Sequence, residues 1–284
     1  MRNNYLKHIS SLLLATLFIS TSGVLGKFIS MPTEIIVWFR AAFAMVFLYF
    51  FCKLKKIDLH IKSTKDYFPF VISGIFMAAH WVTYFYALKL SNVAIGVLSL
   101  YTFPIMTALM EPLFLKIKFN PVYIILGIMV LTGLYILTPS FNLEASKTKG
   151  VLFGIFSAFC YSIRILILKQ KVAKYNGSML MFYQTLIISI VLFPTLFFMD
   201  LSGFKSQLPY LLLLAILTTA IGHSLMLHSL KFFSASTASI ISSLQPLFGI
   251  LLAFLFLKEL PSLNTFYGGS IILLTVVIES VRNK

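Results

Sequence analysis

The sequence predicts an all-α membrane protein with ten transmembrane helices, arranged as two inverted repeats of five helices each. Hydrophobic residues make up 59% of the 284 residues and charged residues only 11%, whereas soluble domains carry about 25% charged residues. Apolar runs recur along the whole chain, and about 20 such residues span a bilayer as a helix. Residues 87–137 and 229–279 also repeat one another in register, without a gap.

The repeat pairs equal residue types at a constant offset of half the chain length. Pro104 pairs with Pro246, and the Leu-Phe-Leu-Lys sequence of residues 113–116 recurs at residues 255–258. Each copy runs through two long apolar stretches, with a proline inside the first. Duplicated bundles of membrane helices are a common way to build transporters, so the repeat is the strongest indication of function.

Ten apolar spans account for most of the chain. They lie at roughly residues 9–27, 33–52, 67–89, 93–115, 121–138, 150–170, 178–199, 207–230, 236–257 and 263–280. We expect the first to be an uncleaved helix, because nine further spans follow it. The connections are short and leave no room for a catalytic domain outside the membrane. We divide the chain into a first five-helix repeat, residues 1–142, and a second, residues 143–284.

The net charge of +15 would suggest nucleic-acid binding in a soluble chain. Here the Lys and Arg residues lie mainly in loops, where they set the orientation in the membrane. With the N-terminus inside, fifteen of them are cytoplasmic, six are outside, and Arg40 and Arg164 lie within spans. We expect a protein of the inner (plasma) membrane with both termini cytoplasmic, in contact with lipid and not with nucleic acid.

Five spans per half is an odd number, so the second half must be inverted relative to the first. Inverted repeats allow one central site to open alternately to either side of the membrane. One chain contains both halves and forms a complete pathway, so we expect a monomer or a homodimer.

Ionisable side chains inside the spans indicate the candidate site. Arg40, His80, Glu111, Arg164 and His223 all fall there. Such residues cost about 2.5–3.5 kcal/mol at the bilayer centre and usually face a cavity or a partner. We expect Arg40, or else Arg164, to attract a carboxylate of the substrate, and Glu111 or His80 to carry a proton if transport is proton-coupled. Each also has a structural alternative, such as an Arg164–Glu111 pair or a hydrogen bond between helices.

Aromatic and amide side chains complete the expected substrate site. They are Trp81, Tyr84, Tyr101, Gln184 and Gln245, with Gln184 at the place in the second half that Arg40 holds in the first. For the aromatic residues, packing between helices is the alternative interpretation.

The two repeat-related prolines, Pro104 and Pro246, predict kinks in equivalent helices, because proline removes a helical hydrogen bond. We expect these helices to line the path and to bend as the site opens.

Motifs of enzymes are missing. We find no His-Glu-x-x-His metal helix, no nucleophile beside a base and no P-loop for ATP. Cys52 and Cys160 show neither metal spacing nor a disulfide framework. We expect no catalytic residues, no metal and no cofactor.

The whole pattern resembles the drug/metabolite transporter superfamily, and within it the EamA-type transporters. The resemblance rests on the two five-span halves, the Ala-Leu-Lys at residues 87–89 before a cluster of small residues, the paired prolines, and the Lys-Glu-Leu at residues 258–260. It implies that Arg40 matches an arginine on the family's second span and Glu259 a glutamate after the proline. The first half departs from this pattern, with Ile117 at the position equivalent to Glu259.

The resemblance implies a secondary transporter that moves a small metabolite, an amino acid or a related organic compound, outward by alternating access. Two alternatives remain open. One is an exchanger of phosphorylated or nucleotide-linked sugars within the same superfamily. The other is a membrane scaffold or regulator that transports nothing.

Overall fold

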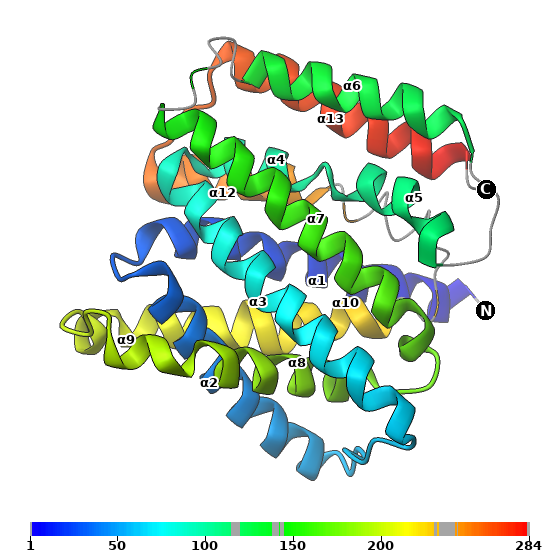
Figure 1. Cartoon of the computed structure of the whole chain (residues 1–284), viewed down its shortest axis with the longest axis vertical. Coiled ribbons are helices and arrows are strands. Elements are labelled where there is room, and N and C mark those ends of the chain that lie inside the picture. Colours follow the sequence, from blue (N-terminus) through cyan, green and yellow to red (C-terminus); the bar gives the residue numbers. More distant parts are fainter. Residues whose placement is uncertain are drawn as a thin grey trace.

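The computed structural model describes residues 2–114, 120–137, 142, 145–229, 232, 242 and 244–282. Within these residues every regular element is a helix (Figure 1). Helices satisfy all their backbone hydrogen bonds internally, which lipid requires of a spanning segment. The all-α prediction is confirmed.

The described part of the first half contains six α-helices. They are α1 (Arg2–Phe28), α2 (Thr33–Leu54), α3 (Tyr67–Leu90), α4 (Val93–Leu100), α5 (Phe103–Phe114) and α6 (Val122–Leu137), and a short 3-10 turn, η1 (Thr64–Asp66), precedes α3.

The second half follows the same order. It contains α7 (Ser146–Val172), α8 (Gly177–Leu192) with the 3-10 turn η2 (Phe193–Phe197), α9 (Phe204–Leu213), the π-helix η3 (Leu214–His223), α10 (Ser224–Ser229), α12 (Leu244–Leu257) and α13 (Leu263–Arg282).

Each of the ten predicted spans coincides with a helical segment. Seven stretches in the described part of the chain are long and apolar enough to cross a membrane, and the shorter apolar helices α6, α12 and α13 match the other three spans. The chain is therefore a multi-pass membrane protein, as predicted. The expected boundary between residues 142 and 143 falls where the structure describes only part of the chain, so it stays a prediction.

The fourth span differs from its expected form. We expected one kinked helix, but α4 ends at Leu100, and Tyr101 and Thr102 form a turn before α5 begins. Pro104 has no N–H to donate to Leu100, and the Thr102 N–H donates to the Ser99 carbonyl over 3.4 Å instead. The proline thus separates two helices.

The eighth span changes its winding near the centre. Its middle section, η3, is a π-helix, and the Thr219 hydroxyl donates to the Leu214 carbonyl five residues earlier, over 3.3 Å. π-Helical turns are rare and occur frequently at functional sites. Here the wider turn carries Thr218, Thr219 and His223, all buried.

The two halves make equivalent contacts with each other: when a helix of the first half packs on a helix of the second, their repeat equivalents also pack together. Helix α3 packs on α7. Its repeat equivalents, η3 and α10, pack on α1, which is the equivalent of α7. Helix α1 also contacts α12, as α7 contacts α4 and α5; α2 pairs with α8, and α6 with α13. Figure 1 shows α6 and α13 side by side along one edge of the molecule. This exchange symmetry is what two repeats about a common two-fold axis produce.

The α6–α13 pair shows the inversion directly. A Cβ atom on Gly133 would lie 2.7 Å from Cγ1 of Ile272, and one on Gly268 would lie 2.6 Å from the Gly133 carbonyl oxygen and 3.2 Å from Cγ of Leu137. Gly133 thus lies beside Ile272, and Leu137, further along α6, lies beside Gly268, which comes earlier in α13. The fifth helices of the two halves therefore run antiparallel. Glycine at the crossing lets the backbones approach closely.

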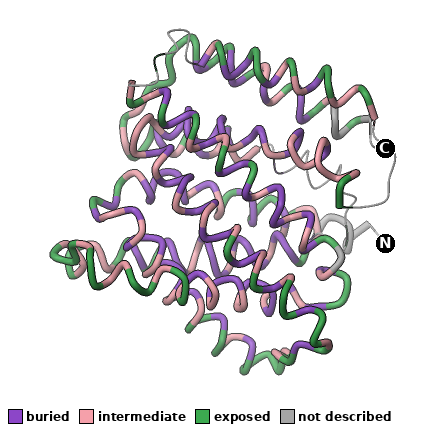
Figure 2. Tube along the Cα trace, in the orientation of Figure 1, coloured by how far each residue is buried: buried purple, intermediate pink, exposed green. Residues whose placement is uncertain are grey.

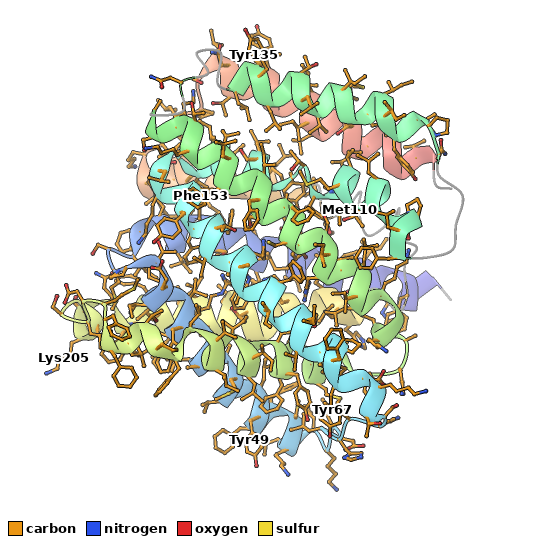
Figure 3. All side chains as sticks on the ribbon, viewed as in Figure 1. Tyr49, Tyr67, Met110, Tyr135, Phe153 and Lys205 are labelled. Atoms are coloured by element: carbon orange, nitrogen blue, oxygen red, sulfur yellow. The ribbon has the colours of Figure 1, made fainter. Side chains whose placement is uncertain are left out.

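The outer surface is more apolar than that of a soluble protein, although the core is apolar as well. Buried residues lie in the interior helices, and exposed residues concentrate on the outer faces and loops (Figure 2). The exposed set includes large apolar side chains such as Leu54, Leu113 and Phe198. Tyr49 and Tyr135 extend from opposite edges of the bundle (Figure 3). A contiguous apolar exterior of this size matches a lipid environment.

We predict that Gly133→Val destabilises the protein by roughly 1–3 kcal/mol, because the added methyl groups overpack the α6–α13 crossing. Thermal unfolding in detergent measures the effect. Gly127→Val is the matched control on the same helix, where a Cβ atom meets only Leu109, at 3.9 Å. Equal melting temperatures for the two variants would contradict the close crossing.

Candidate functional site

A buried guanidinium lies at the centre of the bundle. Arg40 on α2 is 1% exposed. Its Nε donates to the Thr219 hydroxyl on η3 over 2.7 Å, and its Nη1 donates to the Ser22 hydroxyl on α1 over 3.2 Å. Three helices from both halves thus hold the charged group. Neutral hydroxyls are its acceptors, so its positive charge is hydrogen-bonded and not neutralised.

An aromatic surface covers one side of this guanidinium. The Arg40 Cζ lies 3.8 Å from the ring centroid of Trp81 on α3 and 5.7 Å from that of Phe85. A desolvated cation over an indole ring gains about 2 kcal/mol or more, which offsets part of the burial cost. The Trp81 ring also lies 5.8 Å from the His223 ring. Its Nε1 is buried and has no hydrogen-bond partner among the described residues.

A second buried guanidinium comes from the other half. Arg164 on α7 donates to Oε1 of Gln184 on α8 through both Nε (3.2 Å) and Nη2 (2.7 Å). Its Cζ lies 5.3 Å from the ring of Tyr161. The Gln184 Nε2 is buried, and the part of the chain that the structure describes offers it no hydrogen-bond partner. The position equivalent to Arg40 therefore serves as an acceptor for an arginine on the neighbouring helix.

Acidic residues are kept away from both arginines. Each carboxylate with a described contact binds a group other than these arginines. Glu34 accepts from Tyr86, Asp58 from the His60 N–H, Asp66 from Lys171, Lys174 and Tyr175, Glu111 from Lys169, Asp200 from Ser202, and Glu259 from the Val93 N–H. In the part of the chain that the structure describes, neither Arg40 nor Arg164 has a carboxylate partner. Two buried positive charges are left without counter-charge.

His80 connects the two arginine environments. Its Nδ1 lies 2.8 Å from the Ser157 Oγ on α7 and 3.2 Å from the Ser157 carbonyl oxygen. The Ser157 hydroxyl donates its one proton to the His80 carbonyl, over 2.9 Å. Nδ1 must then carry the hydrogen and donate, which leaves Nε2 as the basic nitrogen. The His80 ring lies 4.7 Å from Tyr161 and 6.2 Å from Tyr84.

The structure brings most of the predicted residues into one region. Arg40 and His223 both lie against Trp81, and His80, which directly precedes Trp81 on α3, stacks against Tyr84. Gln184 joins the region through Arg164 and Tyr161. Tyr101 connects through Phe103, which packs against Tyr161, and its hydroxyl donates to the Ser242 carbonyl of the second half.

Other predicted residues lie apart from this region or at its edge. Glu111 forms an ion pair with Lys169 and is partly exposed; Arg164, its other proposed partner, bonds to Gln184. The half-buried Gln245 accepts a bond from the Ser20 hydroxyl through its backbone oxygen, over 3.3 Å. Pro246 is buried near the start of α12, and several residues before it lie outside the described part of the chain.

The sequence analysis did not identify four residues of this site, namely Ser22, Ser157, Tyr161 and Thr219. The 4–3 spacing of Ser157, Tyr161 and Arg164 is a stripe on one helix face, and this signal could have identified two of them. Ser22 and Thr219 carry no comparable pattern.

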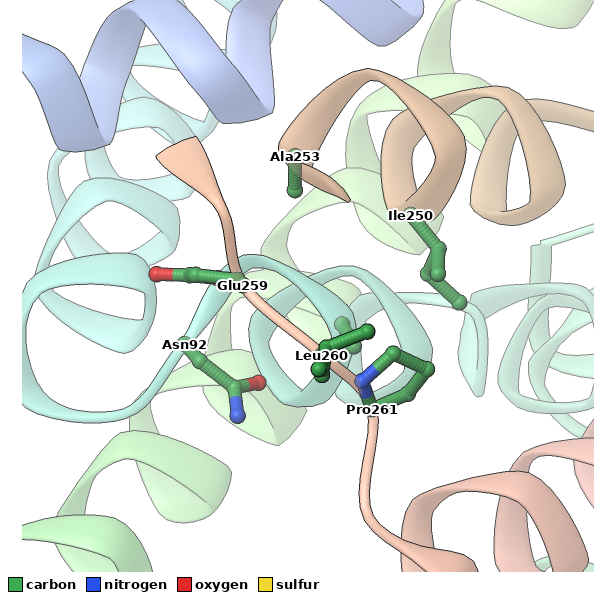
Figure 4. A pocket seen from close by; sticks show the side chains of 7 residues that line it. Asn92, Ile250, Ala253, Glu259, Leu260 and Pro261 are labelled. Atoms are coloured by element: carbon green, nitrogen blue, oxygen red, sulfur yellow. The ribbon is translucent and has the colours of Figure 1, made fainter. Parts of the chain in front are cut away.

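Glu259, which the family resemblance singled out, lies in the connection between α12 and α13. Its carboxylate accepts a 2.8 Å bond from the Val93 N–H at the start of α4, where the Asn92 side chain accepts from the Ile95 N–H, also over 2.8 Å. Figure 4 shows Glu259 and Asn92 beside Leu260 and Pro261 around a small hollow. A residue of the second half thus caps a helix of the first half.

Comparison with known proteins gives a consistent result. Residues 6–138 and 148–281 each match the EamA-like transporter family. The pseudopaline exporter CntI of Pseudomonas aeruginosa is 24% identical over 97% of both chains. An uncharacterized transporter of Archaeoglobus fulgidus is 30% identical over 52% of this chain and 53% of that protein. A crystal structure 15% identical in sequence aligns with a TM-score of 0.69 over 97% of both chains, which supports the fold.

We predict that Glu259→Gln lowers stability by about 0.5–2 kcal/mol, because it removes a charged cap from the α4 N-terminus. Thermal unfolding in detergent tests this. The control is Asp200→Asn, which changes a carboxylate in an exposed loop. A loss as large in the control would show that the effect is not one of capping.

Proposed function

This chain belongs to the EamA-like transporter family, and on that premise we propose that it is a secondary transporter exporting a small organic anion by alternating access. We place it in the inner membrane with both termini cytoplasmic, as the loop charges favour. The start of α1 and the end of α13 lie on the same side of the helical body (Figure 1), which agrees with an even number of spans.

The observation that carries the proposal is the uncompensated Arg40 guanidinium at the junction of the two halves. It is held by hydroxyls from α1 and η3 and by a ring from α3. A buried ionisable group with no counter-charge is costly, and such groups usually serve a substrate or ion pathway. A carboxylate of the substrate would supply the missing charge, with Trp81 and Tyr84 packing against its apolar part.

The basic nitrogen of His80, Nε2, makes this residue our candidate for a proton carrier if transport is coupled to protons. Glu111 remains the second candidate. Its ion pair with Lys169 would have to open before it could exchange a proton.

The outward direction is supported by the relative that spans the whole chain and bears the name of an exporter. The exchange of phosphorylated compounds remains the second candidate activity, because guanidinium groups bind phosphate as well as carboxylate. Flux that requires a substrate on the opposite side of the membrane would favour exchange.

Two cross-half ion pairs close the side that we assign to the cytoplasm. Asp66, ahead of α3, accepts bonds from Lys171 (2.5 Å), Lys174 (2.7 Å) and Tyr175 (2.5 Å) around the α7–α8 turn. The Asp66 carboxylate raises the pKa of Lys174 above its ordinary value of 10.5, so this lysine stays charged throughout the neutral range and loses its proton only at alkaline pH. We call these four residues the cytoplasmic latch.

We predict that Arg40→Gln lowers the uptake of an anionic substrate into inside-out proteoliposomes at least about tenfold. The reason is that one charge-assisted hydrogen bond is worth about 1.5–3 kcal/mol. Lys205→Gln removes the same charge from an exposed position (Figure 3) and should transport like the unmodified protein.

Unchanged flux in Arg40→Gln would end the assignment of Arg40. The absence of any substrate-dependent flux in the unmodified protein would instead favour a scaffold or regulatory role.

We predict that Asp66→Asn makes the centre more accessible from the cytoplasmic side, because the change removes the negative charge of the latch and with it the ion pairs to Lys171 and Lys174. The measurement is the rate at which a maleimide labels Met181→Cys in a chain where Cys52 and Cys160 are replaced by Ser. Met181 is buried beside Arg164, so its labelling reports opening, and we expect a rate roughly threefold higher or more, as for the loss of a pair worth about 1 kcal/mol.

The matched control is Asp58→Asn in the same loop, whose carboxylate accepts a hydrogen bond from the nearby His60 N–H and forms no ion pair among the described residues. A latch variant that labels no faster than this control would show that the ion pairs do not hold the two halves closed.

A further inference from the structure

We infer that the substrate carries two separated acidic groups, one bound at Arg40 and the other at Arg164 with Gln184. This inference rests on the proposed function and specifies its substrate class. The observation behind it is the number of buried charges. Both guanidinium groups are at most 2% exposed, and neither has a carboxylate partner among the described residues.

The Arg40 subsite has donors to spare. A guanidinium carries five N–H groups, and the bonds to Thr219 and Ser22 use one on Nε and one on Nη1. The indole N–H of Trp81 lies beside this group and is buried without an acceptor. Buried donors are normally satisfied, and each exception calls for an explanation. An anionic oxygen at this position would satisfy Trp81 and neutralise Arg40.

The Arg164 subsite repeats this arrangement with different residues. Because Oε1 of Gln184 accepts from both Nε and Nη2 of Arg164, its amide orientation is fixed. A flipped amide would place its NH₂ group against the guanidinium. The Gln184 Nε2 must therefore point elsewhere, and it is buried without an acceptor. Arg164 and this amide form a second set of donors that an acidic group would satisfy.

Aromatic residues of α3 and α7 form a row between the two subsites, and one step of this row is made by the chain itself, because His80 directly precedes Trp81. Arg40 lies over Trp81, the neighbouring His80 contacts Tyr161, and Tyr161 contacts Arg164. The ends of this row bear positive charge, and its middle is aromatic. A matching ligand has an acid at each end and an apolar chain between them. The described part of the centre offers no carboxylate for a ligand's ammonium group, which separates this class from cationic metabolites.

The test compares diacids with their half-amides, which have nearly the same shape but one charge fewer. Binding of succinate, glutarate and adipate, each against its half-amide, is measured by calorimetry on the full-length protein in nanodiscs. We expect at least one diacid to bind about tenfold or more tightly than its half-amide, because the half-amide leaves one buried guanidinium unpaired.

Two variants address the second subsite. Arg164→Gln removes its charge, and Gln184→Glu places a carboxylate where Arg164 already donates, thereby neutralising it internally. In both variants, the affinities for a diacid and for its half-amide should differ by less than about threefold. Gln184→Glu keeps every helix contact and adds an ion pair, so it tests the inference even if Arg164→Gln does not fold. Lys205→Gln is the control and should retain the preference.

Three outcomes would overturn the inference. One is equal binding of diacid and half-amide by the unmodified protein; another is a preference that survives Gln184→Glu. The third is binding and transport of a monoanion or neutral metabolite with no binding of any diacid, which would leave the proposed function standing. Absence of flux for every compound would contradict the proposed function itself, so the two failures are distinguishable.

Discussion

The rest of the site depends on keeping a guanidinium charged inside an apolar bundle without giving it a carboxylate. Arg40 solves this problem with two hydroxyls and an indole ring, each from a different helix. Neutral acceptors and a ring lower the cost of burial while leaving the charge uncompensated. The packing of α1, α2, α3 and η3 around one side chain follows from that requirement, and η3 comes from the opposite half. A charged group thus specifies how the repeats meet.

Charges of the two signs are distributed differently within the bundle. Arg40 and Arg164 are buried without a carboxylate partner among the described residues, and the described carboxylates lie at helix ends and loops. There Asp66 and Glu111 join the first half to lysines of α7 and its following turn. Separating these pairs costs little near water, whereas separating a buried pair at the centre would cost far more. Under the proposed function, this arrangement would let the halves move at their edges while the centre keeps its charge for a ligand.

Most of the architecture could be predicted from the sequence, because apolar length and the 142-residue repeat are local or periodic signals. The break between α4 and α5 could not, since a proline in a membrane helix can bend the helix or end it. Arg40 and Trp81 stood out as unusual residues at mid-depth. Thr219 and Ser22 did not, because serine and threonine are common in membrane helices. The Arg164–Gln184 pair depends on which faces of α7 and α8 meet, and sequence spacing alone does not determine that.

The bond between Glu259 and the Val93 N–H has a consequence for biosynthesis. Chains generally fold from the N-terminus as they are made, yet the start of α4 awaits a residue translated 166 positions later. Until the ninth span has emerged, an N–H at the beginning of this helix lacks its acidic acceptor. The first half therefore gains this cap, worth about 0.5–2 kcal/mol, only after the second half has been made.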